Sequence, residues 1–361
     1  MFLMINGRDV TNYVNTVSSG GSINGCARTL DAQLLQTPND PNIETLGLST
    51  GAEVQFSSDG YYFYGVLAKL DRPTEGNVLT IKAYDMGLYL KRNSVTQKIS
   101  GASPSSAART LCRRFGVRTG YLEETGTSFT RIFKNTTLYA AIMTGYTFAS
   151  QKTGEKYQIT FDGSLMCVVE RGTIIAGTMR PGSNLMEATY SESIERVVNR
   201  VDMYDKEGNL VDSVHGDTSI GIMAQALTLT EERGRDYAQK ILRDNKLARS
   251  GSVEILGNPL CVTGNAVLVH EPYSGLYGKF YIDSDTHTWK NGLYICRLKL
   301  NFENMMDEQE AGSAIRKSSQ KQAAVHHANN TERPEAAEPE TPSKPHLVYT
   351  GPHGEIIYED P

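Results

Sequence analysis

Short apolar runs separated by turn dipeptides fill the first hundred residues. In the clearest case, residues 61–70 and 78–84 are two such runs on either side of a polar turn, which is the pattern of a β-hairpin. Strands spaced this closely predict a first β-barrel or sandwich over residues 1–98. The turn dipeptides are Asn6-Gly7, Gly20-Gly21, Asn24-Gly25, Asp59-Gly60 and Gly76-Asn77.

A helical period replaces this pattern from about residue 99. Ser103 and Pro104 are typical of a helix start, and Gly116 is typical of a helix end. A second helix is expected from Thr137 to Gly154, followed by a hairpin over residues 157–170. Residues 99–186 are therefore predicted to form a small inserted α+β domain. The apolar side chains expected on the buried helix faces are Ala107, Ala108, Leu111, Cys112, Phe115, Leu138, Ile142, Met143, Tyr146 and Ala149.

The β pattern returns over residues 187–303. Its last two runs flank Asn291-Gly292, the strongest short hairpin signal in the chain. A helical segment at about residues 215–249 interrupts it, and Thr228 and Glu231 have the spacing of a capping box. The predicted fold class is therefore mainly β, with two β domains that flank an α+β insertion.

The composition changes once more near the C-terminus. From residue 303 onward the chain has eleven acidic and five basic residues, and only two of its aromatic residues. Because such a segment buries little apolar surface, residues 304–361 are predicted to be a flexible acidic extension with several prolines. The end of the extension has two short apolar runs around a Gly-Pro turn, typical of a hairpin or a docking strand. The candidate partner-binding residues there are Leu347, Val348, Tyr349, Ile356, Ile357 and Tyr358.

Charge and cysteine content exclude several classes of protein. The 361 residues include 36 basic and 41 acidic ones, and the net charge of −5 argues against a general nucleic-acid binder. No run of apolar residues is long enough for a membrane span, and the N-terminus lacks the pattern of a secretory signal. The five cysteines are odd in number and widely spaced, so we expect reduced, buried thiols.

Motifs of catalysis and cofactor binding are missing from the sequence. It contains no GxGxxG, Walker, GxSxG or HExxH motif and no zinc-type cysteine spacing, so no cofactor is expected. His215, Asp217 and Ser219 are the residue types of a hydrolase triad, but two-residue spacing within a turn cannot arrange them as one.

One stretch does combine side chains that could carry chemistry. Strand alternation would place Asp283, Asp285 and His287 on one face, where they could bind a metal or act as acid and base. The alternative is a polar face that is solvated or that contacts a neighbouring strand or subunit. The aromatic residues leave two interpretations as well. Trp289 could be a packing anchor or a sugar-stacking platform, and the run from Tyr61 to Tyr64 could be an interface or ordinary strand.

Several stretches, in order, resemble the baseplate hub proteins of contractile phage tails, defective prophages and R-type bacteriocins, the late-control gene D or XkdQ-like group. The similarity covers about residues 1–303, and the extension from Asn304 departs from the family pattern. The stretches that carry it are Ser22-Ile-Asn-Gly-Cys-Ala-Arg-Thr-Leu, Phe63-Tyr-Gly-Val-Leu, residues 79–90 (LTIKAYDMGLYL), 137–144, 153–163, 190–201 and 285–294.

The resemblance implies a structural virion protein of the tail baseplate, assembled in the cytoplasm of the bacterial host. Each subunit of such hubs has two similar β-barrels, so a homotrimer forms a pseudo-sixfold ring that matches a sixfold tail tube to a threefold spike. The implied partners are the tail tube, the spike, a LysM-type hub-associated protein and the tape measure. No enzymatic activity is expected. The alternatives are a peptidoglycan-degrading hub enzyme and a carbohydrate-binding receptor-recognition protein.

Overall fold

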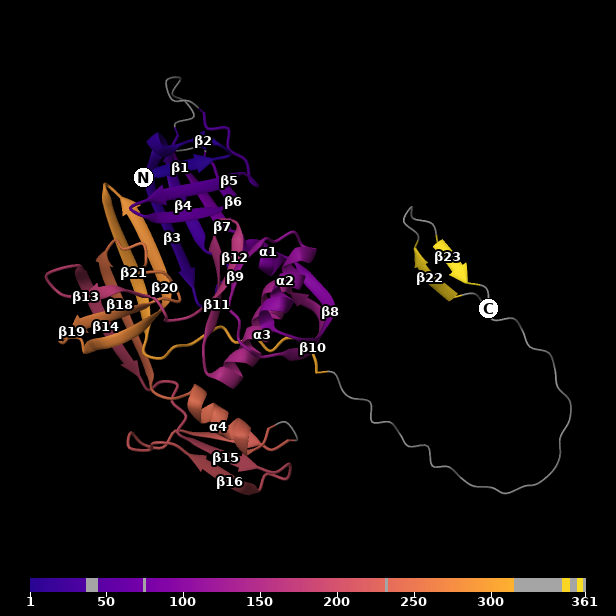
Figure 1. Ribbon diagram of the computed structural model, residues 1–361. Helices are drawn as coiled ribbons and strands as arrows, with labels where there is room; N and C mark the ends of the chain where they lie inside the picture. The colour runs from indigo at the N-terminus through magenta and orange to yellow at the C-terminus, as the bar shows by residue number, and fades with distance from the viewer. Residues whose placement is uncertain (37–44, 74–75, 231–232, 315–345, 351–355, 360–361) are drawn as a thin grey trace. The chain divides into compact units, whose positions relative to one another are not determined.

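A computed structural model of the chain describes residues 1–36, 45–73, 76–230 and 233–314, together with the backbone of two short strands near the C-terminus. The fold is mainly β, as predicted (Figure 1). The chain divides into two compact units, Met1–Ile315 and Arg316–Pro361. In the described residues, no helix is both long enough and apolar enough to cross a bilayer.

The N-terminal strands enclose a first hydrophobic core. The predicted hairpin is confirmed, because β6 pairs antiparallel with β7. The elements are β1 (Phe2–Ile5), β2 (Arg8–Asp9), η1 (Thr11–Tyr13), β3 (Val14–Ser22), β4 (Thr29–Leu35), β5 (Glu53–Ser58), β6 (Tyr61–Asp71) and β7 (Val78–Asp85). The turn predicted at Gly20-Gly21 is wrong, since both glycines lie within β3. A Cβ on Gly20 would stand 2.5 Å from the carbonyl oxygen of Asp285, so the close approach of a neighbouring strand explains this glycine.

The middle of the chain forms the predicted α+β region around a second core. Ser103 caps α2 and Thr137 caps α3 by accepting hydrogen bonds from the amides of Ser106 and Ala140, and Gly154 ends α3 with a φ of +84°. Both predicted helices are confirmed. The elements are α1 (Gly87–Arg92), β8 (Ser94–Ala102), α2 (Pro104–Arg114), β9 (Thr119–Leu122), β10 (Phe129–Thr137), α3 (Leu138–Thr153), β11 (Tyr157–Asp162) and β12 (Leu165–Glu170).

The strands of the C-terminal half enclose a third core. The elements are β13 (Ile175–Met179), β14 (Leu185–Ser193), β18 (Ala248–Leu256), β19 (Ala266–Glu271), β20 (Leu276–Lys290) and β21 (Leu293–Asn301). β13 pairs in parallel with β19, so this β region begins before the boundary predicted at residue 187.

A fourth, smaller core lies apart from these sheets. β15 (Arg200–Tyr204), β16 (Leu210–His215) and β17 (Ala224–Thr228) form a separate sheet that packs against α4 (Arg235–Asp244). The structure differs here from the prediction of one helical segment over residues 215–249. The residue preceding α4 is Gly234, whereas Thr228 ends a strand that pairs with β15, so the predicted capping box is wrong.

β20 joins the first and third cores within one 13-stranded sheet. Its residues 276–281 pair with β19 and its residues 284–290 pair with β3, so two segments far apart in sequence share one ladder (Figure 1). The pairing with β21 shifts register between Ile282 and Ser284, which marks a β-bulge at Asp283.

The residues that directly follow β21 still pack on the body of the protein. Met306 is buried in the core of the α+β region, and the amide of Ala311 donates to Thr144 Oγ1 on α3 at 3.0 Å. Ser313 forms a β-bridge with Ile132. The predicted extension from residue 304 is therefore wrong at its start, because residues 304–313 pack on the body of the protein.

The terminal hairpin is confirmed at the level of the backbone. β22 (His346–Thr350) pairs antiparallel with β23 (Ile356–Glu359). The prediction that the preceding acidic stretch is flexible falls on residues 315–345, outside the described residues.

Candidate functional site

The bulge in β20 separates Asp283 from Asp285 and His287, the two residues that alternation had placed on one face with it. Asp285, His287 and Trp289 all point into the protein, with relative exposures of 2%, 0% and 5%. Asp283 lies at the bulge and pairs with different residues. The described part of the chain has no group of three or more His, Cys, Asp or Glu side chains arranged to hold a metal ion.

Asp285 forms a buried ion pair with Arg28, which stands just before β4. Arg28 Nη1 donates to Asp285 Oδ1 at 3.0 Å, and Nη2 donates to Oδ2. The amide and hydroxyl of Thr263 both donate to Oδ1 at 2.6 Å. Burial opposes ionisation, but the Arg28 guanidinium and the hydrogen bond with His287 hold the pKa of Asp285 well below its usual range. A carboxylate so strongly stabilised in its charged form is a poor general acid or base.

His287 connects this carboxylate to a buried thiol. Its Nε2 lies 3.2 Å from Asp285 Oδ2, and its Nδ1 lies 3.2 Å from Cys296 Sγ and 2.7 Å from Tyr294 Oη. Burial lowers the pKa of His287, but its hydrogen bonds with Asp285 and Cys296 more than offset this and raise the pKa. Sequence reasoning missed Cys296, since only the pairing of β20 with β21 brings it opposite His287.

Asp285, His287 and Cys296 thus have the connectivity of an acid–base–nucleophile triad, but they lack access to a substrate. His287 and Cys296 are both fully buried. A nucleophile must reach its substrate, so this arrangement is a structural brace between strands.

The buried Arg171 forms a second ion pair with the half-buried Asp283, which ties the α+β region to β20. Arg171 follows β12 and is 2% exposed, and its Nη2 donates to Asp283 Oδ1 and to the carbonyl of Ile282, both at 3.2 Å. Asn301 Nδ2 donates to the other carboxylate oxygen of Asp283 at 2.7 Å. The carboxylates of both Asp283 and Asp285 are therefore ion-paired with arginines.

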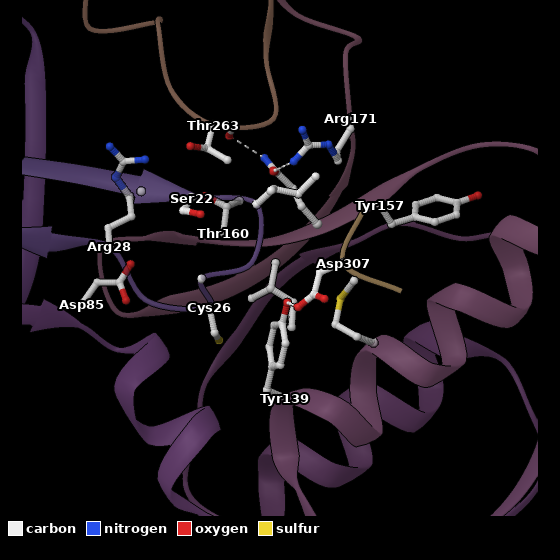
Figure 2. A pocket seen from close by; sticks show the side chains of 16 residues that line it. Ser22, Cys26, Arg28, Asp85, Tyr139, Tyr157, Thr160, Arg171, Thr263 and Asp307 are labelled. Carbon is white, nitrogen blue, oxygen red and sulfur yellow. Dashed lines mark hydrogen bonds between the residues drawn. The ribbon is translucent and has the colours of Figure 1, made fainter. Parts of the chain in front are cut away.

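A small polar cavity lies between these two ion pairs (Figure 2). Arg28, Arg171 and Thr263 line one part of it, while Tyr139 and Asp307 face each other across another, with Tyr139 Oη donating to Asp307 Oδ2 at 2.7 Å. Its volume is about 40 Å³. That volume accommodates one or two water molecules and is too small for a substrate.

Asp85 also lines this cavity, and among the described residues its carboxylate forms no ion pair with an arginine. Its Oδ1 accepts a hydrogen bond from the amide of Gly87 at 2.8 Å. Burial raises the pKa of Asp85 from 3.8 to about 6. Sequence analysis did not single out this carboxyl group.

The aromatic residues divide between core and surface. Trp289 Nε1 donates to Asp59 Oδ2 at 3.0 Å, and its ring stacks on Tyr294 with centroids 4.5 Å apart. Tyr61 is buried beside His287 and hydrogen-bonds Ser19, whereas Tyr62 is exposed on the opposite face of β6. The packing-anchor interpretation therefore fits Trp289, and the tyrosine run has one buried and one exposed side.

Comparison with known sequences gives a consistent set of relatives. The model of the YQBQ-like family matches residues 17–301. The phage-like element PBSX protein XkdQ of Bacillus subtilis is 24% identical over 316 residues, which cover 82% of this chain and 96% of that protein. The uncharacterized protein YqbQ of the same organism is 22% identical over 317 residues, with the same coverage.

Solved structures of tail proteins share the fold. The 43 kDa tail protein of prophage MuSo2 from Shewanella oneidensis superimposes with a TM-score of 0.64 at 13% identity, over 83% of this chain and 97% of that one. A tail protein of Neisseria meningitidis gives a TM-score of 0.60 at 13% identity, over 83% and 95%. An Escherichia coli type VI secretion component, described as similar to the T4 tail proteins gp27 and gp5, gives 0.52 at 10% identity, over 86% and 79%.

Proposed function

The chain belongs to the YQBQ-like family and is a phage tail baseplate hub-like protein, and from this premise we propose that it is the trimeric hub of a contractile tail or R-type bacteriocin. In this role three copies form a ring between the sixfold tail tube and the threefold spike. The ring would display both symmetries, because each copy carries two β cores. The tape measure and a LysM-type hub-associated protein are further partners.

The observation that carries this proposal is the way β20 joins two cores. The first core, which includes Leu30 and Ile81, and the third core, which includes Phe280 and Leu298, lie along one continuous sheet. A chain built this way can present two β surfaces to the tail tube and one surface to the spike. Matching a tube of six subunits with three copies requires such a duplicated surface.

The buried polar residues support a structural role over the enzymatic and sugar-binding alternatives. Asp283 and Asp285 are both ion-paired, so neither is poised as the acid of a peptidoglycan hydrolase. Trp289 is 5% exposed and already stacked, so its ring is not available to a sugar. Zymography of the purified protein on peptidoglycan is expected to show no lytic band.

The terminal hairpin is proposed to recruit a neighbouring baseplate protein. The motivation is its sequence: Leu347, Val348, Tyr349, Ile356, Ile357 and Tyr358 form two apolar runs that follow an acidic stretch. A docking segment tethered to the ring binds its partner at raised effective concentration, so modest affinity suffices.

Mass photometry of the chain co-expressed with its tube and spike proteins tests the hub role. The expected result is a complex that contains three copies of this chain. A complex with one or two copies would overturn the proposal.

A further inference from the structure

The turn between β19 and β20, residues 271–277, presents two tyrosines to solvent, and we call it the aromatic turn. Tyr273 is 99% exposed and Tyr277 is 69% exposed. The backbone of the turn is nonetheless fixed by Glu271. Its Oε1 accepts a hydrogen bond from the amide of Tyr273 at 3.1 Å, and its Oε2 accepts one from the amide of Ser274 at 2.6 Å. An aromatic side chain held outside the protein on a fixed turn is typical of a binding anchor.

A groove lies at the far end of β20, where this strand and β21 meet the first core. Its volume is about 460 Å³, and the turn formed by Asn291 and Gly292 lines part of it. Three apolar side chains on its wall are exposed, namely those of Met1, Leu35 and Leu293. We call this groove the end groove. A cavity with several exposed apolar side chains offers a partner surface that is favourable to cover.

The two surfaces lie at opposite ends of one strand. The aromatic turn leads into Leu276, the first residue of β20, and the end groove is lined by Lys290, its last residue. The strand has 15 residues, so at about 3.3 Å per residue its ends are on the order of 45 Å apart along the strand. The aromatic turn of one chain therefore cannot enter the end groove of the same chain and can enter only that of another.

The two surfaces also belong to different β cores. Leu276 is part of the third core, whereas Trp289, which lines the end groove, is part of the first core. In the proposed ring the third core of one copy stands beside the first core of the next. The aromatic turn and the end groove therefore come from the two cores that meet between copies, which favours a second copy of this chain as the occupant of the groove.

Charge does not oppose this contact. Glu271 and Lys279 accompany the tyrosines of the aromatic turn. Asp59, Lys290 and the amino group of Met1 lie at the end groove. Because each surface carries both signs of charge, burial of apolar and aromatic side chains is the driving force for association.

From these observations we infer that the aromatic turn of one copy inserts into the end groove of the next copy, with Tyr273 as the anchor. Because the turn and the groove are different surfaces, the contact is heterologous, and its repetition around an axis closes a ring. This inference rests on the proposed hub, and it names the surfaces through which neighbouring subunits meet.

Chemical cross-linking between two tagged chains of different size tests the contact. One chain carries Pro272→Cys, which leaves Tyr273 in place, and the other carries Leu35→Cys or Leu293→Cys at the groove. The five native thiols are buried and do not compete. A short bis-maleimide added to tail particles that contain both chains is expected to join the two chains through at least one of these pairs. Particles that contain only one of the two variants should give no such product.

Tyr121→Cys provides a matched control. Tyr121 is as exposed as Leu293 but lies on β9 in the α+β region, so it is expected not to cross-link with Pro272→Cys. If no pair cross-links in particles that contain three copies, or if Pro272→Cys links to the tube or spike protein instead, the contact is wrong while the hub stands. If the particles do not contain three copies, the hub itself fails, whichever pairs cross-link.

Substitution of the anchor gives an independent readout, measured as the fraction of complexes that keep three copies over a dilution series. Tyr273→Ser is expected to weaken association roughly tenfold, as loss of an aromatic anchor does, whereas Tyr273→Phe should keep most of it. Leu293→Asp should weaken association as well, because it buries a charge in the groove. Tyr121→Ser should leave association unchanged. No loss in Tyr273→Ser, or an equal loss in Tyr121→Ser, would overturn the inference.

Discussion

Arg28 and Asp285 stand 257 positions apart in the sequence and form a buried ion pair, with Nη1 and Oδ1 3.0 Å apart. The pair holds the start of β4 against β20, at the point where β20 turns from one core to the other. Tyr61 Oη accepts a further hydrogen bond from Arg28 Nη2 at 3.1 Å. The junction between the two β regions is therefore fixed by charge as well as by the strand ladder.

Removal of one partner of this pair should be costly. Arg28→Met or Asp285→Asn is expected to lower the free energy of unfolding by about 3–5 kcal/mol, because either change leaves a buried charge without its partner. The double variant should lose less than the sum of the two. Urea unfolding followed by Trp289 fluorescence measures all three.

The exposed pair between Lys69 and Asp71 is the control. The side chains of both residues are more than half exposed, so Asp71→Asn should cost less than about 1 kcal/mol. Additive losses for Arg28 and Asp285 would show that the two residues act independently.

Asp85 makes stability depend on pH in a defined window. The pKa of Asp85 is raised by burial to about 6 in the folded protein, from 3.8. The folded state therefore holds this proton more tightly than the unfolded state, and stability falls as pH rises from about 4 to above 6. Asp85→Asn is expected to remove about 1–3 kcal/mol of this fall. An unchanged pH profile of unfolding in the variant would show that Asp85 is ionised throughout.

Local sequence patterns correctly predicted the helix starts and the hairpin turn, because neighbouring residues determine these features. Ser103 and Thr137 start their helices as capping residues do, and Asn291-Gly292 turns the hairpin of β20 and β21. The capping box at Thr228 failed because parallel pairing of β17 with β15 outweighs a local preference. The turn predicted at Gly20-Gly21 failed for a similar reason, since both residues lie within β3 and the approach of β20 requires a glycine at Gly20.

The polar network could be predicted only in part. Of the three residues that alternation placed on one face, Asp285 and His287 do share it, because that part of β20 is regular. The bulge at Asp283 breaks the alternation, and no pattern in the neighbouring sequence predicts it. Arg28, Arg171 and Cys296 were missed, since contacts between residues so distant in sequence are set by the topology of the sheet.

The thiols should be unreactive in the folded protein. All five cysteines are buried, and burial raises the pKa of the Cys261 and Cys26 thiols. A thiol reagent such as DTNB is expected to titrate no cysteine rapidly under native conditions and five after unfolding in urea. One fast equivalent that disappears in Cys296→Ala would instead identify an accessible nucleophile beside His287.

Two truncations separate the body of the protein from its extension. A chain that ends at residue 314 is expected to keep the stability of the full chain. A chain that ends at residue 303 should be about 2–5 kcal/mol less stable, since it loses the buried Met306 and the bond from the Ala311 amide to Thr144.

The recruitment of a baseplate protein by the shortened chain tests the role of the terminal hairpin. The chain that ends at residue 314 should still form the ring but should recruit less of the baseplate protein that binds the terminal hairpin. Equal recruitment by the full and shortened chains would assign the hairpin no role in docking.

A reconstruction of the tail tip with this chain located in it tests the central claim most directly. The account predicts three copies around the axis, with the first and third cores of each copy alternating as six similar β units beneath the tube. A ring of any other copy number, or one in which the two cores do not occupy equivalent positions around the axis, would contradict it.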